Sequence, residues 1–519
     1  MFGGSKMELG NLPIIHKMIE RQTQFSTSAW RSKVTEGLQK HSIHISTLAQ
    51  PDTEINDFLF PFGMQTHDLP PLRKHVAEMK RPVFAILKNV MQNFLGSGAF
   101  RTLLTEATRY FTRKRKFSPM KLVGFLLRMQ GDSLQAELLK EEEFLGGRVT
   151  ASAFVQAVAK FPPEALHEIL RRFNQAMPEP DTFEGYRLFA IDGSDFPVPF
   201  HPASKNKVRC GTKLECCLLH ANVLYDLKSG RFEDCVFQPR SEANERRAAL
   251  AMIHRMMTKS PYIVIMDRGY PAFNLIEACN RAENCHYVIR NNENIKEIKE
   301  LPDETCDANM DFLIRTKGRT GINPKSGIYV HNIKRYRHDH ANGKEIKCWD
   351  FEDICHVKCC VVKFFIHTGK DQKGHWEILI TNLDREKFPI DKLKRLYRLR
   401  WDVETSFRHL KYPLDGLRFH SRKDDVVEAE ILARMIKYNA ISQLLENVPA
   451  RKDDARKYSY AINFKMAISC VCEFLHSSRL SQKRLVEKIF EYKVPIRPGR
   501  NAPRHIKAKM PVGLLYHMP

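Results

Sequence analysis

Four residues in the C-terminal half of the sequence have side chains that can bind phosphate or a cation, and their spacing suits one face of a helix. Tyr397, Arg400, Glu404 and Lys411 lie in the segment 393–414, whose pattern predicts a single helix. At about 100° per residue, these four positions fall within an arc of roughly 60°. A phenol, a guanidinium, a carboxylate and an ammonium group would therefore form one polar stripe along the helix.

An apolar stripe runs beside the polar one, so the helix already has a side that can face a core. It consists of Leu393, Leu396, Leu399, Val403, Phe407 and Leu410. The polar stripe can then serve a function. The alternative is a solvated face with charge pairs such as Arg400 with Glu404, which stabilise a helix only slightly.

Two aspartates, Asp192 and Asp267, are each predicted to stand where a short apolar strand ends. In α/β sheets the ligand crevice lies outside the carboxyl ends of the strands, so both side chains would point into one cleft. Each aspartate also fits ordinary turn chemistry, because it precedes Gly or Arg-Gly. Asp195 and Asp226 compete for the first position, and Asp192 is preferred because it is the first polar residue after the predicted buried strand 187–191, Arg-Leu-Phe-Ala-Ile.

Glu404 could join these two aspartates as a third carboxylate. Mutual repulsion raises the pKa of clustered carboxylates, so proteins seldom gather three without a cation. Mg²⁺ prefers oxygen ligands, and two such ions about 4 Å apart can hold the attacking and leaving oxygens of a phosphodiester. The three carboxylates therefore predict a site for two Mg²⁺ ions, with Mn²⁺ as a substitute.

The elements around these residues predict an α/β fold with a helical region before it. Helical periodicity runs from 72 to 177, with helix starts at Ser118-Pro119 and Pro162-Pro163. From Tyr186 the order is β-β-β-α-β-α-β, which indicates a sheet with mixed strand directions. A strand-rich block and then the 393–414 helix follow.

We expect six regions along the chain. They are an N-terminal segment of unknown role (1–75), a helical DNA-binding domain (76–180), the first part of a catalytic core (183–290), a β-strand insertion (291–385), the second part of the core with the polar stripe (386–450), and C-terminal helices with a basic tail (451–519).

The charge balance favours a polyanionic partner. The chain has 83 Lys and Arg against 60 Asp and Glu, a formal net charge of +23. Such a field attracts nucleic acid, and binding would depend steeply on salt. The basic run 113–116, Arg-Lys-Arg-Lys, lies between two predicted helices, where it either contacts DNA or is simply solvated.

The cysteines and the apolar runs indicate a soluble intracellular protein. Thirteen scattered cysteines, an odd number, favour reduced thiols over a disulfide framework. Cys355, His356, Cys359 and Cys360 cluster, but strand alternation would send them to opposite faces, which disfavours a zinc site. No signal peptide and no apolar run of the ~18 residues needed for a membrane span is present.

The polar stripe also resembles a known family signature. Its Tyr-x2-Arg-x3-Glu-x6-Lys pattern is similar to that of DDE-type cut-and-paste transposases of bacterial insertion sequences, the insertion-sequence-four group, which have an RNase H-like fold. Asp192, before Gly-Ser, and Asp267, before Arg-Gly-Tyr, resemble the first two acidic residues of that family. The order of two aspartates, a β insertion and a glutamate is similar too, and the resemblance runs from about Phe111 to the C-terminus.

This resemblance implies an activity. Asp192, Asp267 and Glu404 would be the catalytic metal ligands for nicking double-stranded DNA at the ends of an element, for hairpin formation and for joining to target DNA. Tyr397, Arg400 and Lys411 would bind phosphates near the cut. A homodimer holding both ends, in the bacterial cytoplasm and associated with the nucleoid, is also implied.

The sequence offers further candidate DNA contacts, each with a structural alternative. Arg268 either touches DNA or forms a structural salt bridge. A hairpin needs a base flipped out of the stack, for which Trp349 or Trp376 could provide an aromatic platform, although a Trp in a sheet is more often part of the core. Two rival functions remain: a non-catalytic, repurposed DNA-binding protein, and an RNase H-like nuclease that cuts without joining.

Overall fold

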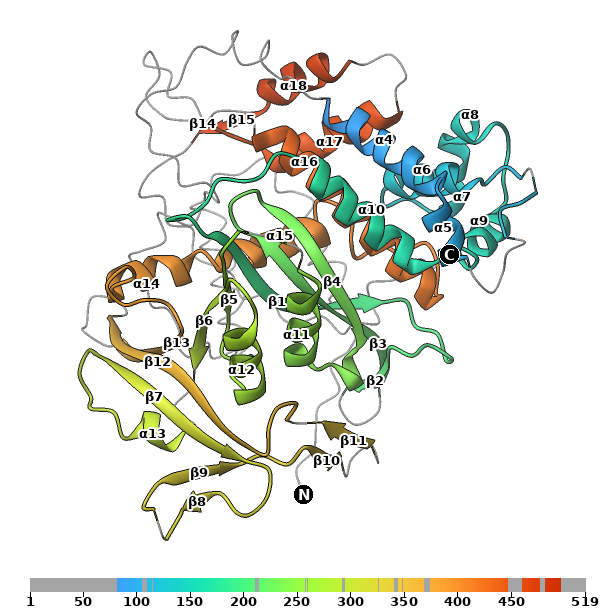
Figure 1. Cartoon of the computed structure of the whole chain (residues 1–519). Helices are drawn as coiled ribbons and strands as arrows, with labels where there is room; N and C mark the ends of the chain where they lie inside the picture. Colours follow the sequence, from blue (N-terminus) through green and yellow to red (C-terminus); the bar gives the residue numbers. More distant parts are fainter. Residues whose placement is uncertain are drawn as a thin grey trace, which may run out of the picture. The chain divides into compact units, whose positions relative to one another are not determined.

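A large mixed β-sheet forms the centre of the protein, as the computed structural model shows (Figure 1). The structure describes residues 82–104, 110–113, 115–210, 214–256, 258, 260–291, 295–324, 326–339, 344–347, 349–367, 374–446, 460–476 and 481–495. All of these belong to one compact unit, Thr53–Pro519. The predicted N-terminal segment 1–75, the basic tail and Lys114 of the basic run lie outside the described residues.

Eleven described strands form the main sheet, in the order β2-β3-β1-β5-β6-β13-β12-β7-β9-β8, with β4 paired to β3. The strands are β1 (Arg187–Val198), β2 (Lys207–Cys210), β3 (Leu214–Asp226), β4 (Arg231–Pro239), β5 (Tyr262–Met266), β6 (Cys285–Asn291), β7 (Cys306–Arg315), β8 (Gly321–Ile322), β9 (Tyr329–Asn332), β12 (Ile354–His367) and β13 (Gly374–Thr381). Two small hairpins pair β10 (Tyr336–Asp339) with β11 (Lys344–Lys347) and β14 (Tyr460–Ile462) with β15 (Lys493–Pro495).

Strand direction changes at β1. This strand is antiparallel to β3 and parallel to β5, and β5 is parallel to β6. The succession β4-β3-β1-β5-β6 is that of an RNase H-like core, which confirms the predicted mixed α/β fold. The strands predicted within 291–385 are present, but β13 pairs with β6 and β12 with β13, so they extend the same sheet.

The helices cover both faces of the sheet. They are α4 (Val83–Leu95), α5 (Gly98–Leu103), α6 (Pro119–Arg128), α7 (Leu134–Lys140), α8 (Glu142–Leu145), α9 (Ala151–Val158), α10 (Pro163–Ala176), η3 (Arg240–Glu242), α11 (Glu245–Arg255), α12 (Phe273–Arg281), α13 (Lys296–Lys299), α14 (Ile390–Arg398), α15 (Trp401–Lys411), α16 (Asp424–Glu446), α17 (Phe464–His476) and α18 (Gln482–Glu491). The predicted starts of α6 and α10, at Ser118-Pro119 and Pro162-Pro163, are confirmed.

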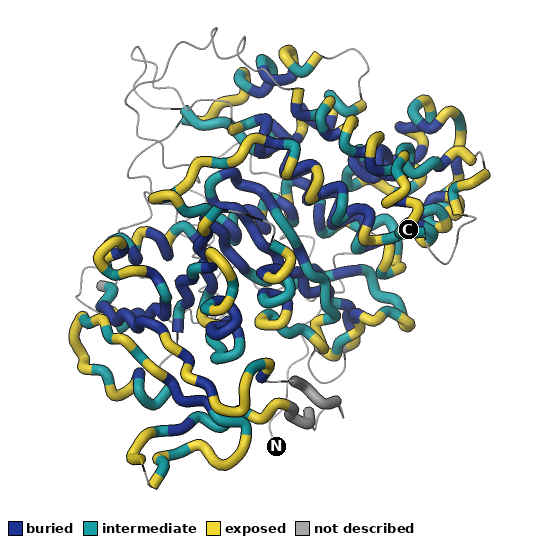
Figure 2. The backbone as a smooth tube through the Cα atoms, viewed as in Figure 1, coloured by how far each residue is buried: buried dark blue, intermediate teal, exposed yellow. Residues whose placement is uncertain are grey.

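Two hydrophobic cores lie on opposite sides of the sheet. The larger core joins α4–α10 and α14–α18 to one face, and the smaller packs α11 and α12 on the other. Buried residues follow the strands of the sheet and the helices packed on it (Figure 2), and every residue of α16 from Ala429 to Leu444 is buried. Among the helices in the described ranges, none combines the length and apolar character needed to cross a membrane.

Two sequence predictions about local structure are wrong. The segment 393–414 is not one helix, because α14 ends at Arg398 and α15 begins at Trp401. Short i to i+3 hydrogen bonds, such as that from the Arg400 amide to the Tyr397 carbonyl (3.1 Å), make a tight turn between them. Cys216 is disulfide-bonded rather than reduced, whereas the other cysteines whose side chains are described are free thiols.

Candidate active site

The pairing of β1 with β5 brings Asp192 and Asp267 together. Their last paired residues are Ile191 and Met266, so the two aspartates follow as neighbours on adjacent parallel strands. Side chains alternate between the faces of a sheet. The preceding same-face residues of both strands lie in the larger core, so both aspartates are on the face covered by α14 and α15.

The prediction that a strand ends at Asp192 is wrong, whereas β5 does end directly before Asp267. Strand β1 continues to Val198 because β3 pairs with it along the whole stretch, down to Val198 with Cys217. The pairing of β1 with β5 ends at Ile191. Beyond that residue β1 has one neighbouring strand fewer, and the run of apolar side chains ends there. Asp192 therefore lies in the middle of β1, level with the C-terminal end of the neighbouring strand β5.

Arg400 links the first and third carboxylates. Its guanidinium lies 3.5 Å from an Asp192 oxygen, Oδ2, and 2.9 Å from Oε1 of Glu404. The arginine stands in the turn between α14 and α15, and only 6% of it is exposed. The turn thus directs its planar fork at two acidic side chains that come from different elements.

Burial and neighbouring charge together set the pKa of Asp192. Burial, helped by the nearby charges of Asp267 and Glu404, raises this pKa to about 7 against the attraction of Arg400. The residue thus behaves as one member of a carboxylate cluster. The sequence prediction that Asp192, Asp267 and Glu404 come together is consistent with this mutual influence.

Lys411 and Tyr397 bound the site on the helix side. The Lys411 ammonium donates to the Ser194 hydroxyl and to the Asp195 carbonyl, each at 2.7 Å. Burial lowers the pKa of this lysine to about 8, although Asp195 and Asp192 favour its charged form. Tyr397 is buried beside Arg400, whose guanidinium is 5.8 Å from the ring centroid, and burial raises the pKa of its phenol.

Comparison with known proteins identifies the family. The family model of the transposase DDE domain matches residues 183–440, a range that contains all six of the predicted acidic and polar-stripe residues. The chain is also 22% identical, over 394 residues, to the transposase InsG of insertion sequence element IS4 from Escherichia coli strain K12, covering 70% of this chain and 77% of that protein. The chain belongs to the DDE transposase family, in its IS4 group.

A solved structure is also similar to this DDE transposase. It is the cryo-EM structure of the piggyBac transposase synaptic complex with hairpin DNA. The TM-score is 0.37 at 9% sequence identity, and the match covers 83% of this chain and 88% of that chain.

Two side chains of this DDE transposase that the sequence patterns did not single out lie near the carboxylates. Arg290 follows Ile289, the partner of Met266, so it neighbours Asp267 on the same face, and its guanidinium is 2.8 Å from Glu377. Trp401 is 40% exposed at the start of α15, with the Arg400 guanidinium 5.2 Å from its ring. The position of Arg290 beside Asp267 follows only from the strand register. Trp401 lies within the predicted helix 393–414 but was not among the candidate site residues.

Three other predicted DNA contacts have different outcomes. Arg268 is exposed and forms no ion pair with any described residue, which leaves it available to a ligand. Trp349 is fully buried, and its indole donates to the Glu352 carbonyl at 2.7 Å, so its prediction as a stacking platform is wrong. Trp376 is half-buried beside Phe365 and Lys363.

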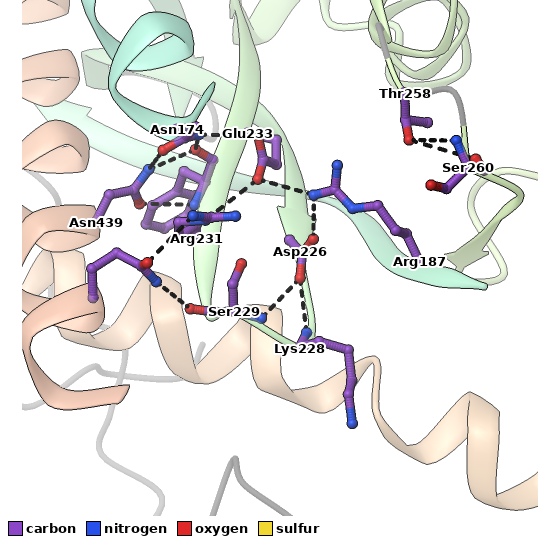
Figure 3. A network of polar contacts seen from close by, with 12 residues as sticks. Asn174, Arg187, Asp226, Lys228, Ser229, Arg231, Glu233, Thr258, Ser260 and Asn439 are labelled. Atoms are coloured by element: carbon purple, nitrogen blue, oxygen red, sulfur yellow. Dashed lines mark hydrogen bonds and ion pairs between the residues drawn. The ribbon is translucent and has the colours of Figure 1, made fainter. Parts of the chain in front are cut away.

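The structure assigns Asp226, one of the rival acidic residues, to a buried structural network (Figure 3). Its carboxylate is 2.6 Å from the Arg187 guanidinium and accepts hydrogen bonds from the Lys228 and Ser229 amides. Glu233 and Arg231 extend the network toward α16. Both carboxylate oxygens of Asp226 therefore bind groups of the fold.

We expect Asp226→Asn to lower stability without affecting catalysis directly. The substitution removes one of the two acidic partners of the partly buried Arg187 and leaves Glu233 at 3.4 Å. The loss should therefore fall below the roughly 3–5 kcal/mol that breaking a fully buried pair costs. Denaturant unfolding would measure this loss. A variant as stable as the wild type would contradict the structural role given to Asp226.

The three carboxylates have the right donor chemistry for divalent cations, since carboxylate oxygens suit Mg²⁺ and Mn²⁺. Within the described part of the chain, however, no three His, Cys, Asp or Glu side chains are already arranged to hold a metal ion. The Arg400 guanidinium stands between Asp192 and Glu404 instead. For all three carboxylates to bind a metal, the Arg400 guanidinium would have to release Asp192 or Glu404.

Cys355 and Cys359 are buried while His356 is exposed, as strand alternation predicted.

Proposed function

We propose that this protein is a DNA transposase that cuts at the ends of an insertion sequence and joins the freed ends to target DNA. The single observation that carries the proposal is the register of β1 with β5, which sets Asp192 beside Asp267 on the face where Arg400 holds Glu404. Membership of the DDE family supports the same reading.

In the proposed reaction, water attacks a phosphodiester at the element end and the 3′-oxygen leaves. The freed 3′-hydroxyl then attacks the opposite strand to form a hairpin, which is reopened before strand transfer. Asp192, Asp267 and Glu404 would hold two Mg²⁺ ions, which when bound supply Lewis-acid stabilisation of the attacking and leaving oxygens.

Tyr397, Arg400, Lys411 and Arg268 would bind the DNA backbone. Arg400 offers a bidentate fork to a phosphate, and Lys411 offers a point charge. Arg268 is exposed next to Asp267, where it could contact a phosphate of bound DNA. For the flipped base of a hairpin, Trp376 and the exposed Trp401 are the candidate stacking surfaces.

The chain would act as a homodimer on paired element ends in the bacterial cytoplasm. The exposed described members of the basic run, Arg113, Arg115 and Lys116, lie in the loop before α6 and could contact DNA beyond the cleavage site. Their phosphate contacts would make affinity fall as salt rises, roughly in proportion to the number of neutralised phosphates.

The deciding experiment is cleavage of a labelled duplex that carries the inverted repeats flanking the gene. We expect hairpin-ended products with Mg²⁺ or Mn²⁺, and none with Glu404→Gln, since the amide keeps the shape of the side chain but loses its charge. The variant should still bind the duplex. Products would be resolved on native and denaturing gels.

Two other outcomes would replace the proposal. Salt-sensitive binding without cleavage in any metal would mean a repurposed DNA-binding protein. Cleavage without hairpins and without joining to a supplied target would mean an RNase H-like nuclease. Full cleavage by Glu404→Gln would remove the third carboxylate from the assignment.

A further inference from the structure

An imidazole lies between two carboxylates on the opposite face of the sheet from Asp192. His220, on β3, has Nδ1 2.6 Å from Oδ1 of Asp195 and Nε2 3.2 Å from Oε1 of Glu245. Only 4% of the His220 side chain is exposed. We call these three residues, Asp195, His220 and Glu245, the His220 clamp. They come from β1, β3 and the first turn of α11, so the clamp ties three elements together.

The His220 clamp packs directly against the backbone of β1 next to Asp192. Asp195 and His220 are paired across β1 and β3, and Gly193 lies two residues along on the same face. A Cβ atom on Gly193 would stand only 2.5 Å from the imidazole Nε2 and 3.1 Å from the nearer Glu245 oxygen. A glycine is therefore needed at this position for the imidazole to reach the strand.

The same glutamate also reaches the turn that carries Asp267. A Cβ atom on Gly269 would lie 3.0 Å from the second Glu245 oxygen, Oε2. The Gly269 amide donates to Oδ1 of Asp267 at 2.7 Å and so fixes the orientation of that carboxylate. The neighbour of Glu245 on α11, Arg246, donates to the Gly269 carbonyl at 3.1 Å. The first turn of α11 thus contacts both Gly193, which follows Asp192, and Gly269, which holds Asp267.

Charge is consistent with this arrangement. Burial lowers the pKa of His220, but its hydrogen bonds to Asp195 and Glu245 outweigh burial and raise the pKa to about 9. At neutral pH the ring is then an imidazolium: Nδ1 donates a hydrogen bond to Asp195, and Nε2 forms an ion pair with Glu245 at 3.2 Å. Arg240 is a second cation on the cluster, 3.3 Å from the other Asp195 oxygen.

We propose that His220 is a positioning residue that, through the clamp, sets the separation of Asp192 and Asp267 and thereby the metal affinity of the site. This inference rests on the proposed function, because it assumes that these aspartates bind the catalytic metal. Residues that orient metal ligands without touching the metal change affinity by about 10–100-fold when altered. His220 approaches the backbone at Gly193, directly after Asp192, and its partner Glu245 approaches Gly269, two residues after Asp267.

The test is calorimetric titration of the full chain with Mn²⁺ in the absence of DNA. We expect His220→Gln to weaken Mn²⁺ binding by about 10-fold or more, because glutamine cannot donate to both carboxylates in the same geometry. Glu245→Gln, which keeps a hydrogen-bond acceptor, should weaken binding in the same direction. The matched control is His356→Gln, because His356 is also paired with an aspartate, Asp311 at 2.8 Å, but lies exposed on β12.

Cleavage assays add a second readout. In His220→Gln the Mn²⁺ concentration for half-maximal cleavage should rise by the same factor, while saturating Mn²⁺ restores most of the maximal rate. Unchanged Mn²⁺ affinity in both clamp variants, with only a lower Tm, would overturn the proposal and leave His220 a purely structural residue. Failure of the wild type itself to bind Mn²⁺ or to cleave would refute the proposed function, and the clamp proposal with it. Should His220→Gln not fold, Glu245→Gln alone decides between these outcomes.

Discussion

Asp192→Asn is expected to abolish strand cleavage and, at the same time, to stabilise the metal-free protein at pH 8. The loss of cleavage follows from removing one charged ligand of the proposed metal site. Charge stabilisation dominates phosphoryl transfer, so we expect the rate to fall by a factor on the order of 10³ or more. DNA binding should persist, because asparagine adds no bulk and the phosphate-binding cations remain.

The stabilisation follows from the raised pKa of Asp192, about 7 in the folded protein against an ordinary value of 3.8. Below the ordinary value both folded and unfolded chains hold the proton, and the residue has no effect on the pH dependence. Between the two values the folded chain keeps a proton that the unfolded chain has lost, so stability falls as pH rises. Above pH 7 the full penalty applies, up to about 4 kcal/mol.

Thermal unfolding of both proteins at several pH values checks this prediction. The difference in Tm between Asp192→Asn and the wild type should be close to zero near pH 4 and should grow through pH 7. Saturating Mn²⁺ should raise the Tm of the wild type but not of the variant, since ligand binding stabilises only the form that binds it. A variant less stable than the wild type at pH 8 would mean that Arg400 outweighs burial at this site.

Arg400→Ala is expected to lose both stability and activity. Its guanidinium is buried and pairs with Asp192 and Glu404, so alanine leaves two acidic groups without their cation. Breaking a buried pair by removing one partner costs about 3–5 kcal/mol. An arginine that stabilises the transition state of phosphoryl transfer contributes about 10³–10⁵ in rate, and we expect a loss at the lower end of that range.

Arg400→Lys is the matched control for this prediction. It keeps the positive charge but has no planar fork to reach both carboxylates, so it should recover much of the stability and little of the activity. The double variant Asp192→Asn with Arg400→Ala should be more stable than Arg400→Ala alone, because the uncompensated charge is gone. Denaturant unfolding and single-turnover cleavage measure the two effects separately. Additive changes in the free energy of unfolding would show that the two residues do not interact.

Local sequence patterns predicted most of the elements around the candidate site and named its candidate residues. Apolar runs of five residues predicted the strands before Asp192 and Asp267, because buried parallel strands need apolar side chains on both faces. Proline after serine or proline predicted the starts of α6 and α10, because proline suits the first helical turn. Residue types and spacing within 393–414 predicted which side chains could act together.

The tertiary structure decided what depends on neighbours far apart in the chain. Strand β1 runs past Asp192 because β3 supplies its hydrogen bonds, and a pairing with residues 217–226 leaves no trace in the pattern of β1 itself. Trp349 is in the core because the smaller cluster closes over it, which its own segment does not reveal. The turn at Arg400 lies between two well-formed helical patterns that join without a Gly or Pro to mark the break.

The sequence by itself thus determined the family, the kinds of element and the candidate carboxylates, since each is written in residue types at short range. Only the tertiary structure placed Asp192 beside Asp267, put Arg400 between two acids and built the His220 clamp behind them. These arrangements arise from strand register and helix packing. Those are set by the summed burial of residues scattered over the whole chain, which no local pattern contains.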